Sequence, residues 1–305
     1  MHGRIFTVLL RTFFFFLAIS AGVNICAGTR DPNTPDARYL EFGQKFPNVV
    51  SVKALRVEGV DDIMQIQELD LSPDSKEKGI KVSFQFGSAV VIRPNWLLTA
   101  GHVVKGAPLV LAVTDDKSEH KLHKIIVHPR FEDEDFGFHD LALCYSAKAF
   151  EMAFYPELYT KLDEVGAAIT IAGYGTTGTF NTGATGEDHQ KRGGHNRIDS
   201  SERTILICTP SIQHDKFPLE FMIAPGDSGG GMFIGNKLAG INSFLMARDK
   251  KPNGSYTDES AFTRISLYHE WIEEQIALHE LAIASKSTMA PDLDKITPIL
   301  TGVAP

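Results

Sequence analysis

The chain has 305 residues, of which 43% are hydrophobic and 22% are charged, and its formal net charge is −8. This is ordinary globular composition, and the length suffices for one large domain or two half-domains around a substantial core. The acidic charge disfavours nucleic acids and anionic membrane surfaces as partners, because both are negatively charged.

The first 27 residues have the pattern of a secretory signal peptide. Two arginines precede an apolar run at 13–19, and small residues follow it. The run is short for a membrane span, which needs about 20 apolar residues. We predict a signal peptide over residues 1–27, with cleavage after Ser20 or near Ala27. The mature protein would then be secreted or periplasmic, without a membrane partner.

Cys144 and Cys208 are the only cysteines that remain after such cleavage. Each lies in an apolar run, where a buried unpaired thiol is the expected state. A large exported domain with at most one possible disulfide must be stabilised by its core. We therefore predict that the two cysteines are not paired.

Residues 28–45 follow the signal segment and begin with a polar stretch rich in Pro, Asp, Thr and Asn. This composition indicates a disordered leader or propeptide. From residue 46 onward the chain consists of short β-type runs separated by turn residues. The clearest of these predicted strands are 81–92, 109–113, 122–127, 141–145, 167–172 and 204–208, with a hairpin over 232–239 that turns at Gly235-Asn236. Many short strands favour an all-β sandwich or barrel.

One segment, from Leu267 to about residue 284, has the periodicity of an amphipathic helix. Its predicted apolar face carries Leu267, Trp271, Ile272, Ile276 and Leu278. The polar, proline-containing tail at 285–305 is expected to be a loose terminus.

The strongest chemical signal is the segment 225–231, Pro-Gly-Asp-Ser-Gly-Gly-Gly. A serine hydroxyl is a poor nucleophile unless a base takes its proton and the developing oxyanion is bound. Glycines beside Ser228 permit a tight backbone turn and let a substrate carbonyl approach N–H groups. A structural turn would explain the glycines but not the Asp-Ser pair between them. Ser228 is therefore a candidate nucleophile.

Two further residues could serve this serine. His102 follows the apolar run 96–98 and small residues, and can present its ring at the edge of a cleft. Asp140 directly precedes the predicted strand 141–145, where a carboxylate can be desolvated and aimed at an imidazole. Neither His102 nor Asp140 alone is strong evidence for catalysis. Together with Ser228 they occur in the chain order His, Asp, Ser, which makes a catalytic triad a coherent interpretation.

With these blocks the sequence resembles the chymotrypsin/trypsin family of serine peptidases, over about residues 46–276. The matching segments are Leu98-Thr99-Ala100-Gly101-His102, Asp140-Leu141-Ala142-Leu143, Gly173-Tyr174-Gly175, Gly226-Asp227-Ser228-Gly229-Gly230 and Thr263 to Ile272. The resemblance implies an all-β fold of two six-stranded antiparallel Greek-key barrels with a C-terminal α-helix. The peptidase domain would span residues 46–284, with the boundary between its barrels near 150–165.

The same resemblance assigns roles to individual residues. It implies that Ser228 is the nucleophile, that His102 is the general base and then the acid, and that Asp140 orients the imidazole. The backbone N–H groups of Gly226 and Ser228 would form the oxyanion hole. The implied reaction needs no cofactor and no metal, and the implied partners are protein or peptide substrates.

Substrate-binding residues also follow from the alignment with the family. Ser243 matches the strand that pairs with the substrate backbone, Met222 falls at the floor of the primary pocket, and Leu245 and Ser260 fall on its walls. Met222 stands where members that cleave after Lys or Arg carry an aspartate. A basic side chain would enter such a pocket unpaired, at a cost of several kcal/mol. The expected pocket is apolar and shallow, and suits small or medium uncharged side chains.

The chain departs from the family pattern in places. Val103 stands where most animal members have a cysteine, and no other family cysteine is present, which points to a bacterial-type secreted member. Gly231 replaces a usual proline after the serine motif, which changes only local packing. No Ile-Val-Gly-Gly start is visible, so we predict activating cleavage at Arg38-Tyr39. The resemblance implies that the α-ammonium released there pairs with Asp227.

Two alternatives remain at this stage. A catalytically silent relative could serve as a binding or interaction module, although none of the three triad residues is missing. The acidic run 132–135 could gather a calcium ion, but successive acids are more often a solvated loop. We therefore predict a secreted serine endopeptidase without a metal site.

Overall fold

The computed structural model describes residues 28–58, 81–132, 137–211 and 216–289. Its first sheet is antiparallel and has seven strands in the order β6-β5-β2-β3-β4-β8-β7. The strands are β2 (Val49–Glu58), β3 (Lys81–Arg93), β4 (Trp96–Thr99), β5 (Val110–Val113), β6 (Glu119–Lys121), β7 (Lys124–Val127) and β8 (Ala142–Tyr145). The predicted runs of this half of the chain are confirmed as strands.

The second sheet follows the order β13-β10-β17-β18-β19-β15-β14. Its strands are β10 (Ala168–Gly173), β13 (Arg192–Arg197), β14 (Ser200–Glu202), β15 (Ile205–Cys208), β17 (Gly231–Ile234), β18 (Lys237–Ala247) and β19 (Asp258–Arg264), and the short β9 (Glu157–Leu158) pairs in parallel with β18. The predicted hairpin joins β17 to β18, and Gly235 in its turn has φ +59°. A small third sheet has the order β12 (Gly183–Gly186), β11 (Thr177–Thr179), β1 (Gly28–Arg30) and β16 (Phe221–Met222).

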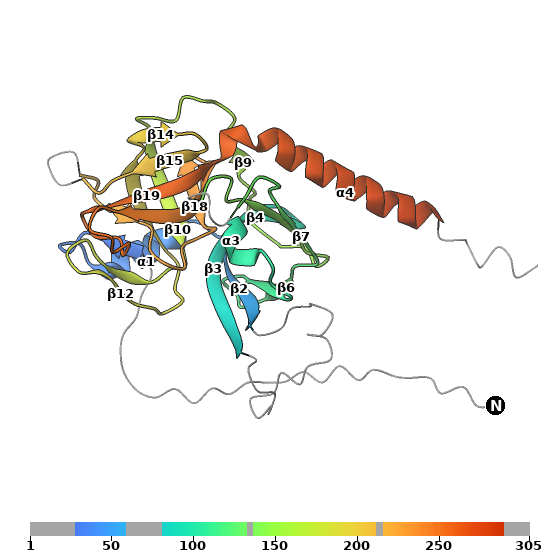
Figure 1. Cartoon of the computed structure of the whole chain (residues 1–305), viewed down its shortest axis with the longest axis horizontal. Helices are drawn as coiled ribbons and strands as arrows, with labels where there is room; N and C mark the ends of the chain where they lie inside the picture. The colour runs from blue at the N-terminus through green and yellow to red at the C-terminus, as the bar shows by residue number, and fades with distance from the viewer. Residues whose placement is uncertain (1–27, 59–80, 133–136, 212–215, 290–305) are drawn as a thin grey trace, which may run out of the picture.

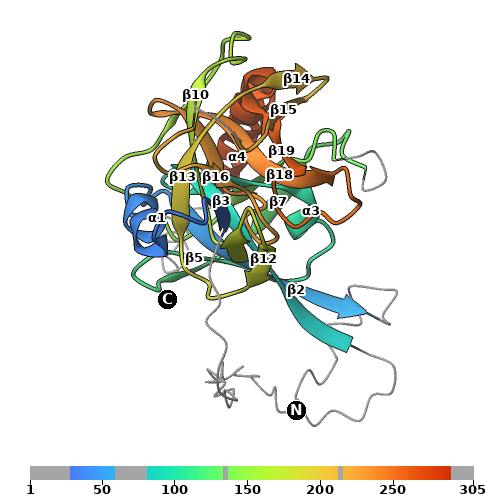
Figure 2. The same cartoon turned by 90° about the vertical axis from the view of Figure 1, so that its left-hand side faces the viewer.

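Two hydrophobic clusters form the core. Leu97, Leu98 and Leu143 are fully buried in the first cluster, which lies mainly at the first sheet but also includes Leu238 and Ile241 of the second. Leu206 and Phe262 are fully buried in the second cluster. Figures 1 and 2 show these sheets as two neighbouring bodies, with the C-terminal helix leading away from them. The fold is thus mostly β, with two curled antiparallel sheets and a C-terminal helix, as predicted.

The C-terminal helix α4 (His269–Met289) follows a short 3-10 turn, η1 (Ile265–Leu267). Ile272 and Ile276 are buried against the first sheet's cluster, whereas Leu267 and Leu278 are 43% and 53% exposed. The prediction that these two leucines lie on the buried face is wrong. Leu267 precedes the helix. Leu278 lies off the buried side of α4, because the next residue, His279, still has its ring against Trp96 and Tyr145. Within the described ranges, no helix combines the length and apolarity that a membrane span requires.

The segment predicted as a disordered leader is part of the folded domain. It forms β1 and the helix α1 (Asp36–Gly43), and the buried Tyr39 donates a hydrogen bond to the carbonyl oxygen of Glu220 at 3.1 Å. The bond Arg38-Tyr39 lies inside α1, so its cleavage would require the helix to open. The prediction that this segment is disordered is wrong, because polar composition does not reveal the contacts that a buried side chain such as Tyr39 makes with distant residues. Cleavage at Arg38-Tyr39 stays a prediction.

The strands β2 and β3 extend beyond the first sheet as a projecting two-stranded ribbon (Figure 2). Val82, Phe84 and Phe86 alternate along its free end, as the sequence suggested, but they are 44%, 51% and 36% exposed. From Gly87 onward β3 is buried. The strand therefore enters the core only at the point where it reaches the candidate site.

The two cysteines are unpaired. Cys144 in β8 and Cys208 in β15 are both free and fully buried. Burial raises the pKa of both thiols, because it disfavours the thiolate. This agrees with the prediction of inert core cysteines.

Candidate active site

His102 lies on the single-turn helix α3 (Gly101–Val104), directly after the buried strand β4. Its side chain is 33% exposed, so the ring is held by the core on one side and open on the other. A side chain on Gly101 would place its Cβ 3.3 Å from the carboxylate of Asp140. Glycine before the histidine therefore allows Asp140 to approach closely.

Asp140 is 1% exposed and lies two residues before the start of β8. Its Oδ1 accepts the backbone N–H of His102 at 2.9 Å, and its Oδ2 lies 2.7 Å from Nδ1 of the same residue. Oδ2 also accepts the hydroxyl of Ser243 at 2.5 Å. An anionic carboxylate in this position favours the tautomer that carries its proton on Nδ1, which leaves Nε2 of His102 as a base.

Ser228 lies in the turn between β16 and β17. Its hydroxyl donates to the carbonyl oxygen of Ser243 at 3.2 Å. Ser243 thus contacts both Ser228 and Asp140, and the structure brings together the predicted His102, Asp140 and Ser228 around it. The sequence assigned Ser243 only to a substrate-binding strand, and the link from its hydroxyl to Asp140 was missed because no local spacing indicates it.

The turn that carries Ser228 has an unusual backbone. Gly226 and Gly229 have φ values of +92° and +89°, which favour glycine. The N–H of Asp227 donates to the carbonyl of Ala224, and the N–H of Gly230 donates to the carbonyl of Asp227. These two bonds close the turn on either side of Ser228.

Asp227 is fully buried next to Ser228. Its carboxylate accepts the N–H of Gly175 at 2.8 Å and the N–H of Ala224 at 2.9 Å. Burial raises the pKa of Asp227 to about 7, although these two N–H groups and the charge of Arg192 act in the opposite direction. A Cβ on Gly173 or Gly175 would lie 2.3 Å or 2.5 Å from this carboxyl group, which explains both glycines of the Gly-Tyr-Gly segment.

The residues predicted to line the primary pocket lie on adjacent strands. Leu245 in β18 is opposite Ser260 in β19, and the Ser260 hydroxyl accepts the N–H of Ile223 at 3.3 Å. Met222 in β16 precedes Ile223, is fully buried and pairs with Thr29 of β1. The sequence did not predict that β1 pairs with β16 beside Met222, because residues 28–45 were expected to be a disordered leader.

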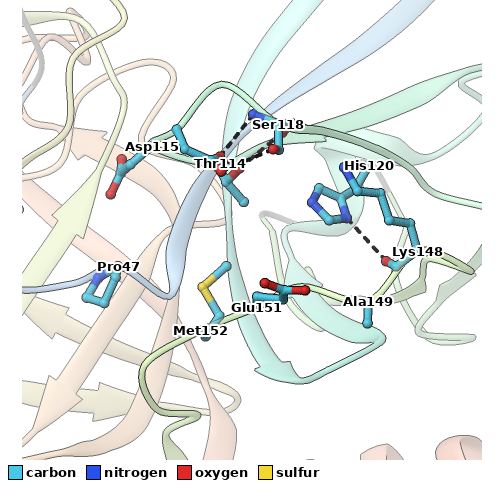
Figure 3. A pocket seen from close by; sticks show the side chains of 10 residues that line it. Pro47, Thr114, Asp115, Ser118, His120, Lys148, Ala149, Glu151 and Met152 are labelled. Carbon is cyan, nitrogen blue, oxygen red and sulfur yellow. Dashed lines mark hydrogen bonds between the residues drawn. The ribbon is translucent and has the colours of Figure 1, made fainter.

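Within the described part of the chain, no group of three or more His, Cys, Asp and Glu side chains is arranged to hold a metal ion. Of the acidic run 132–135, only Glu132 is among the described residues. A hollow of about 400 Å³ lies elsewhere, beside the turn between β5 and β6 (Figure 3). It is lined by His120 and Lys148 among others, and the ring of His120 already contacts the Lys148 carbonyl. None of its lining residues belongs to the candidate active site.

Comparisons with known proteins place the chain in a family. The family model described as Trypsin matches residues 72–272. A curated trypsin of Saccharopolyspora erythraea is 28% identical over 211 residues, which cover 63% of this chain and 87% of that protein.

Two solved structures show the same fold at low sequence identity. Neuropsin, a serine protease expressed in the limbic system of mouse brain, has 18% identity and a TM-score of 0.53, covering 77% of this chain and 96% of that one. HL collagenase has 17% identity and a TM-score of 0.55, covering 76% and 94%. With a family model that spans most of the chain, and with the fold and the His-Asp-Ser arrangement described above, this protein belongs to the trypsin family of serine endopeptidases.

Proposed function

We propose that this endopeptidase hydrolyses peptide bonds through an acyl-enzyme formed on Ser228. The Oγ atom attacks the substrate carbonyl carbon while Nε2 of His102 takes its proton. The N–H groups of Gly226 and Ser228 bind the oxyanion of the tetrahedral intermediate. His102 then gives the proton to the leaving nitrogen, and the C–N bond breaks. A water molecule, activated by the same ring, releases the acid product and restores the Ser228 hydroxyl.

The observation that carries this proposal is the environment of Asp140. Its carboxylate binds the backbone and the ring of His102, and the Ser243 hydroxyl. These contacts hold the imidazole in one orientation and stabilise its positive charge during the reaction. The Ser228 O–H, which now donates to the Ser243 carbonyl, has to turn toward Nε2 of His102 in the reaction. A serine hydroxyl hydrogen rotates readily to suit its acceptor.

A fluorophosphonate probe tests this assignment. The wild type should be labelled, and Ser228→Ala and His102→Ala should each lose labelling and reduce kcat/KM by at least about 10³-fold. The matched control is Ser201→Ala, which removes a hydroxyl from an exposed residue of β14 and should change neither readout.

The outcomes separate the possible functions. Unchanged hydrolysis by Ser228→Ala would overturn the triad assignment. A folded wild type that neither reacts with the probe nor cleaves peptides would instead favour the catalytically silent alternative.

We also propose that the protein is exported, with residues 1–27 as the signal peptide. These residues lie outside the described ranges, and their sequence pattern supports the proposal. Cleavage after Ala27 would leave Gly28 as the first residue. Gly28 pairs with Thr177, two residues after Gly175, whose N–H binds the buried carboxylate of Asp227. An α-ammonium at Gly28 would then pair with Asp227, which is the role that the resemblance assigns to the released N-terminus. The bond Ala27-Gly28 therefore replaces Arg38-Tyr39 as the proposed cleavage site.

N-terminal sequencing and activity test this proposal together. The purified active enzyme should begin at Gly28. A variant that keeps Ala27 after processing should be folded but weakly active, because its ammonium is displaced by one residue. Full activity of that variant would contradict the proposed ion pair.

For specificity, we propose that the primary pocket formed around Met222, Leu245 and Ser260 accepts small or medium uncharged side chains. All three carry no charge, so a basic substrate side chain would remain unpaired at a cost of several kcal/mol. A panel of peptides that differ only in the residue before the scissile bond tests this. The expected order places Ala and Val above Phe, and Phe far above Lys and Arg. Preferred cleavage after Lys or Arg would contradict the pocket assignment.

A further inference from the structure

Ser88 connects the first sheet to the turn that carries the nucleophile. In β3 the pairing with β4 begins at Val90, opposite Leu98, so the backbone of Ser88 lies beyond the end of this ladder. Its N–H donates to the carbonyl oxygen of Ser228 at 2.8 Å, and its own carbonyl accepts the Thr99 hydroxyl at 2.7 Å. Ser88 is fully buried. On the side of β3 that faces β4, the N–H of Ser88 therefore binds the nucleophile turn, while its carbonyl binds the side chain of Thr99 at the end of β4.

The side chain of Ser88 binds the same turn a second time. Its hydroxyl donates to the carbonyl oxygen of Gly226 at 3.1 Å and accepts the N–H of Tyr174 at 2.9 Å. Ser88 thus contacts the carbonyls of Gly226 and Ser228, the two residues whose N–H groups form the proposed oxyanion hole. No other described residue is hydrogen-bonded to both of these carbonyls.

These contacts matter because the turn has little intrinsic rigidity. Gly226 has φ +92° and no side chain, so many backbone orientations are open to it. Rotation of the peptide units next to Gly226 would turn N–H groups away from the oxyanion. The Gly226 carbonyl belongs to the peptide unit that joins Gly226 to Asp227, and this unit connects the two peptide units that carry the N–H groups of Gly226 and Ser228. A hydrogen bond on that carbonyl restricts the connecting unit, and a preformed oxyanion hole depends on such restriction.

The fit between Ser88 and the turn is close. A Cβ on Gly229 would lie 2.0 Å from the Ser88 carbonyl oxygen and 2.2 Å from the Thr99 hydroxyl. Glycine at this position therefore lets the turn approach β3. The close approach is made by the backbone, so Ser88→Ala would retain it and remove only the hydroxyl contacts to Gly226 and Tyr174.

We propose that Ser88 is a positioning residue that holds Gly226 and Ser228 in the geometry that binds the oxyanion. The proposal rests on the proposed function, since it assigns the residue that supports its oxyanion hole. Ser88 does not contact the substrate in this role. Its loss should weaken binding of the transition state and leave binding of the substrate ground state unchanged.

The test compares Ser88→Ala with the wild type, with rates expressed per active site titrated by the fluorophosphonate probe. We expect kcat to fall about 10- to 100-fold, less than the loss of an entire oxyanion-hole donor, with KM within about threefold of the wild type. The affinity of a peptidyl trifluoromethyl ketone, whose adduct places an oxyanion in the hole, should fall by the same factor as kcat/KM. The affinity of a reduced-amide peptide of the same sequence, which lacks the carbonyl oxygen, should not change.

The matched control is Ser51→Ala. Ser51 is the cross-strand neighbour of Ser88 in β2, and its hydroxyl donates to the Val113 carbonyl, within the first sheet. Its loss should change none of these affinities. If Ser88→Ala does not fold, Ser88→Cys keeps a side chain of similar shape with a weaker donor, and should show a smaller loss with the same pattern.

The outcomes distinguish the two proposals. A kcat of Ser88→Ala within twofold of the wild type, or a loss shared equally by the trifluoromethyl ketone and the reduced-amide peptide, would overturn the role of Ser88. Either result would leave the essential role of Ser228 intact. If Ser228→Ala retained full activity, the proposed function itself would fail, whatever Ser88→Ala shows.

Discussion

Two buried aspartates, Asp140 and Asp227, lie on either side of the proposed chemistry and are satisfied in different ways. Asp140 accepts hydrogen bonds from the side chains of His102 and Ser243. Asp227 accepts two backbone N–H groups, and among the described residues no Lys, Arg or His forms an ion pair with it. A buried carboxylate is costly unless donors or a positive charge compensate it. In the proposed mechanism, His102 supplies Asp140 with a partner that becomes positive, whereas the proposed α-ammonium of Gly28 would supply one to Asp227.

The largest expected effect is the loss of kcat when the charge of Asp140 is removed. Asp140→Asn keeps the shape of the side chain but removes the charge and presents an NH₂ group to the ring or to Ser243. The wrong tautomer of His102 would then be favoured, and kcat at neutral pH should fall by about 10⁴-fold. Steady-state kinetics measure this, with Asp249→Asn in an exposed turn as the control. A loss of less than tenfold would show that Asp140 does not fix the tautomer.

A second, smaller effect tests the environment of Asp227, through the pH dependence of the free energy of unfolding. Burial raises the pKa of Asp227 to about 7 from the ordinary 3.8. For a carboxyl group with a raised folded-state pKa, the unfolded state releases its proton first as pH rises. In a chain without an α-ammonium beside it, the contribution of Asp227 to the free energy of unfolding is therefore full below about pH 4 and is lost as pH rises to about 7.

Urea unfolding of Ser228→Ala protein that retains Ala27 measures this contribution, since the inactive background prevents self-digestion. The same protein with Asp227→Asn should lack the decline between about pH 4 and 7. Protein that begins at Gly28 should also lack it, because a neighbouring ammonium favours the ionised carboxylate. Parallel pH profiles for all three proteins would contradict the proposed pairing.

The smallest effect concerns α4, which contacts neither aspartate in the hydrogen bonds given above. Ile276 is 1% exposed in the first sheet's cluster, whereas Leu278 is 53% exposed two residues later. Ile276→Ala should lower the free energy of unfolding by about 2–5 kcal/mol, and Leu278→Ala should change it by less than about 0.5 kcal/mol. Chemical denaturation measures both. Equal losses would mean that the exposed half of the helix is covered in solution.

Much of the fold could be predicted because its signals are local. The strands are short apolar runs between turn residues, and the turn at Gly235-Asn236 connects neighbours in the sequence. The helix was predicted from its periodicity, but periodicity could not show which apolar residues face the sheet. Leu278 is two residues from the buried Ile276, which places it on another side of the helix, and the neighbouring His279 contacts the sheet instead. The order of segment 28–45 was not predicted, because it depends on contacts with residues far away in the sequence. Tyr39, for example, is buried in the second cluster and binds the Glu220 carbonyl.

The sequence by itself determined the residue types and their order: a histidine after a buried strand, an aspartate before another, and a serine in a glycine-rich turn. Only the tertiary structure decided how these residues are held. Ser243 is 103 positions from the Asp140 it contacts, and Ser88 is 138 positions from Gly226. Hydrogen bonds across such separations leave no periodic pattern in a single sequence, because each end lies in an ordinary strand or turn. They form when two curled sheets pack together and bring the ends of their strands to one place.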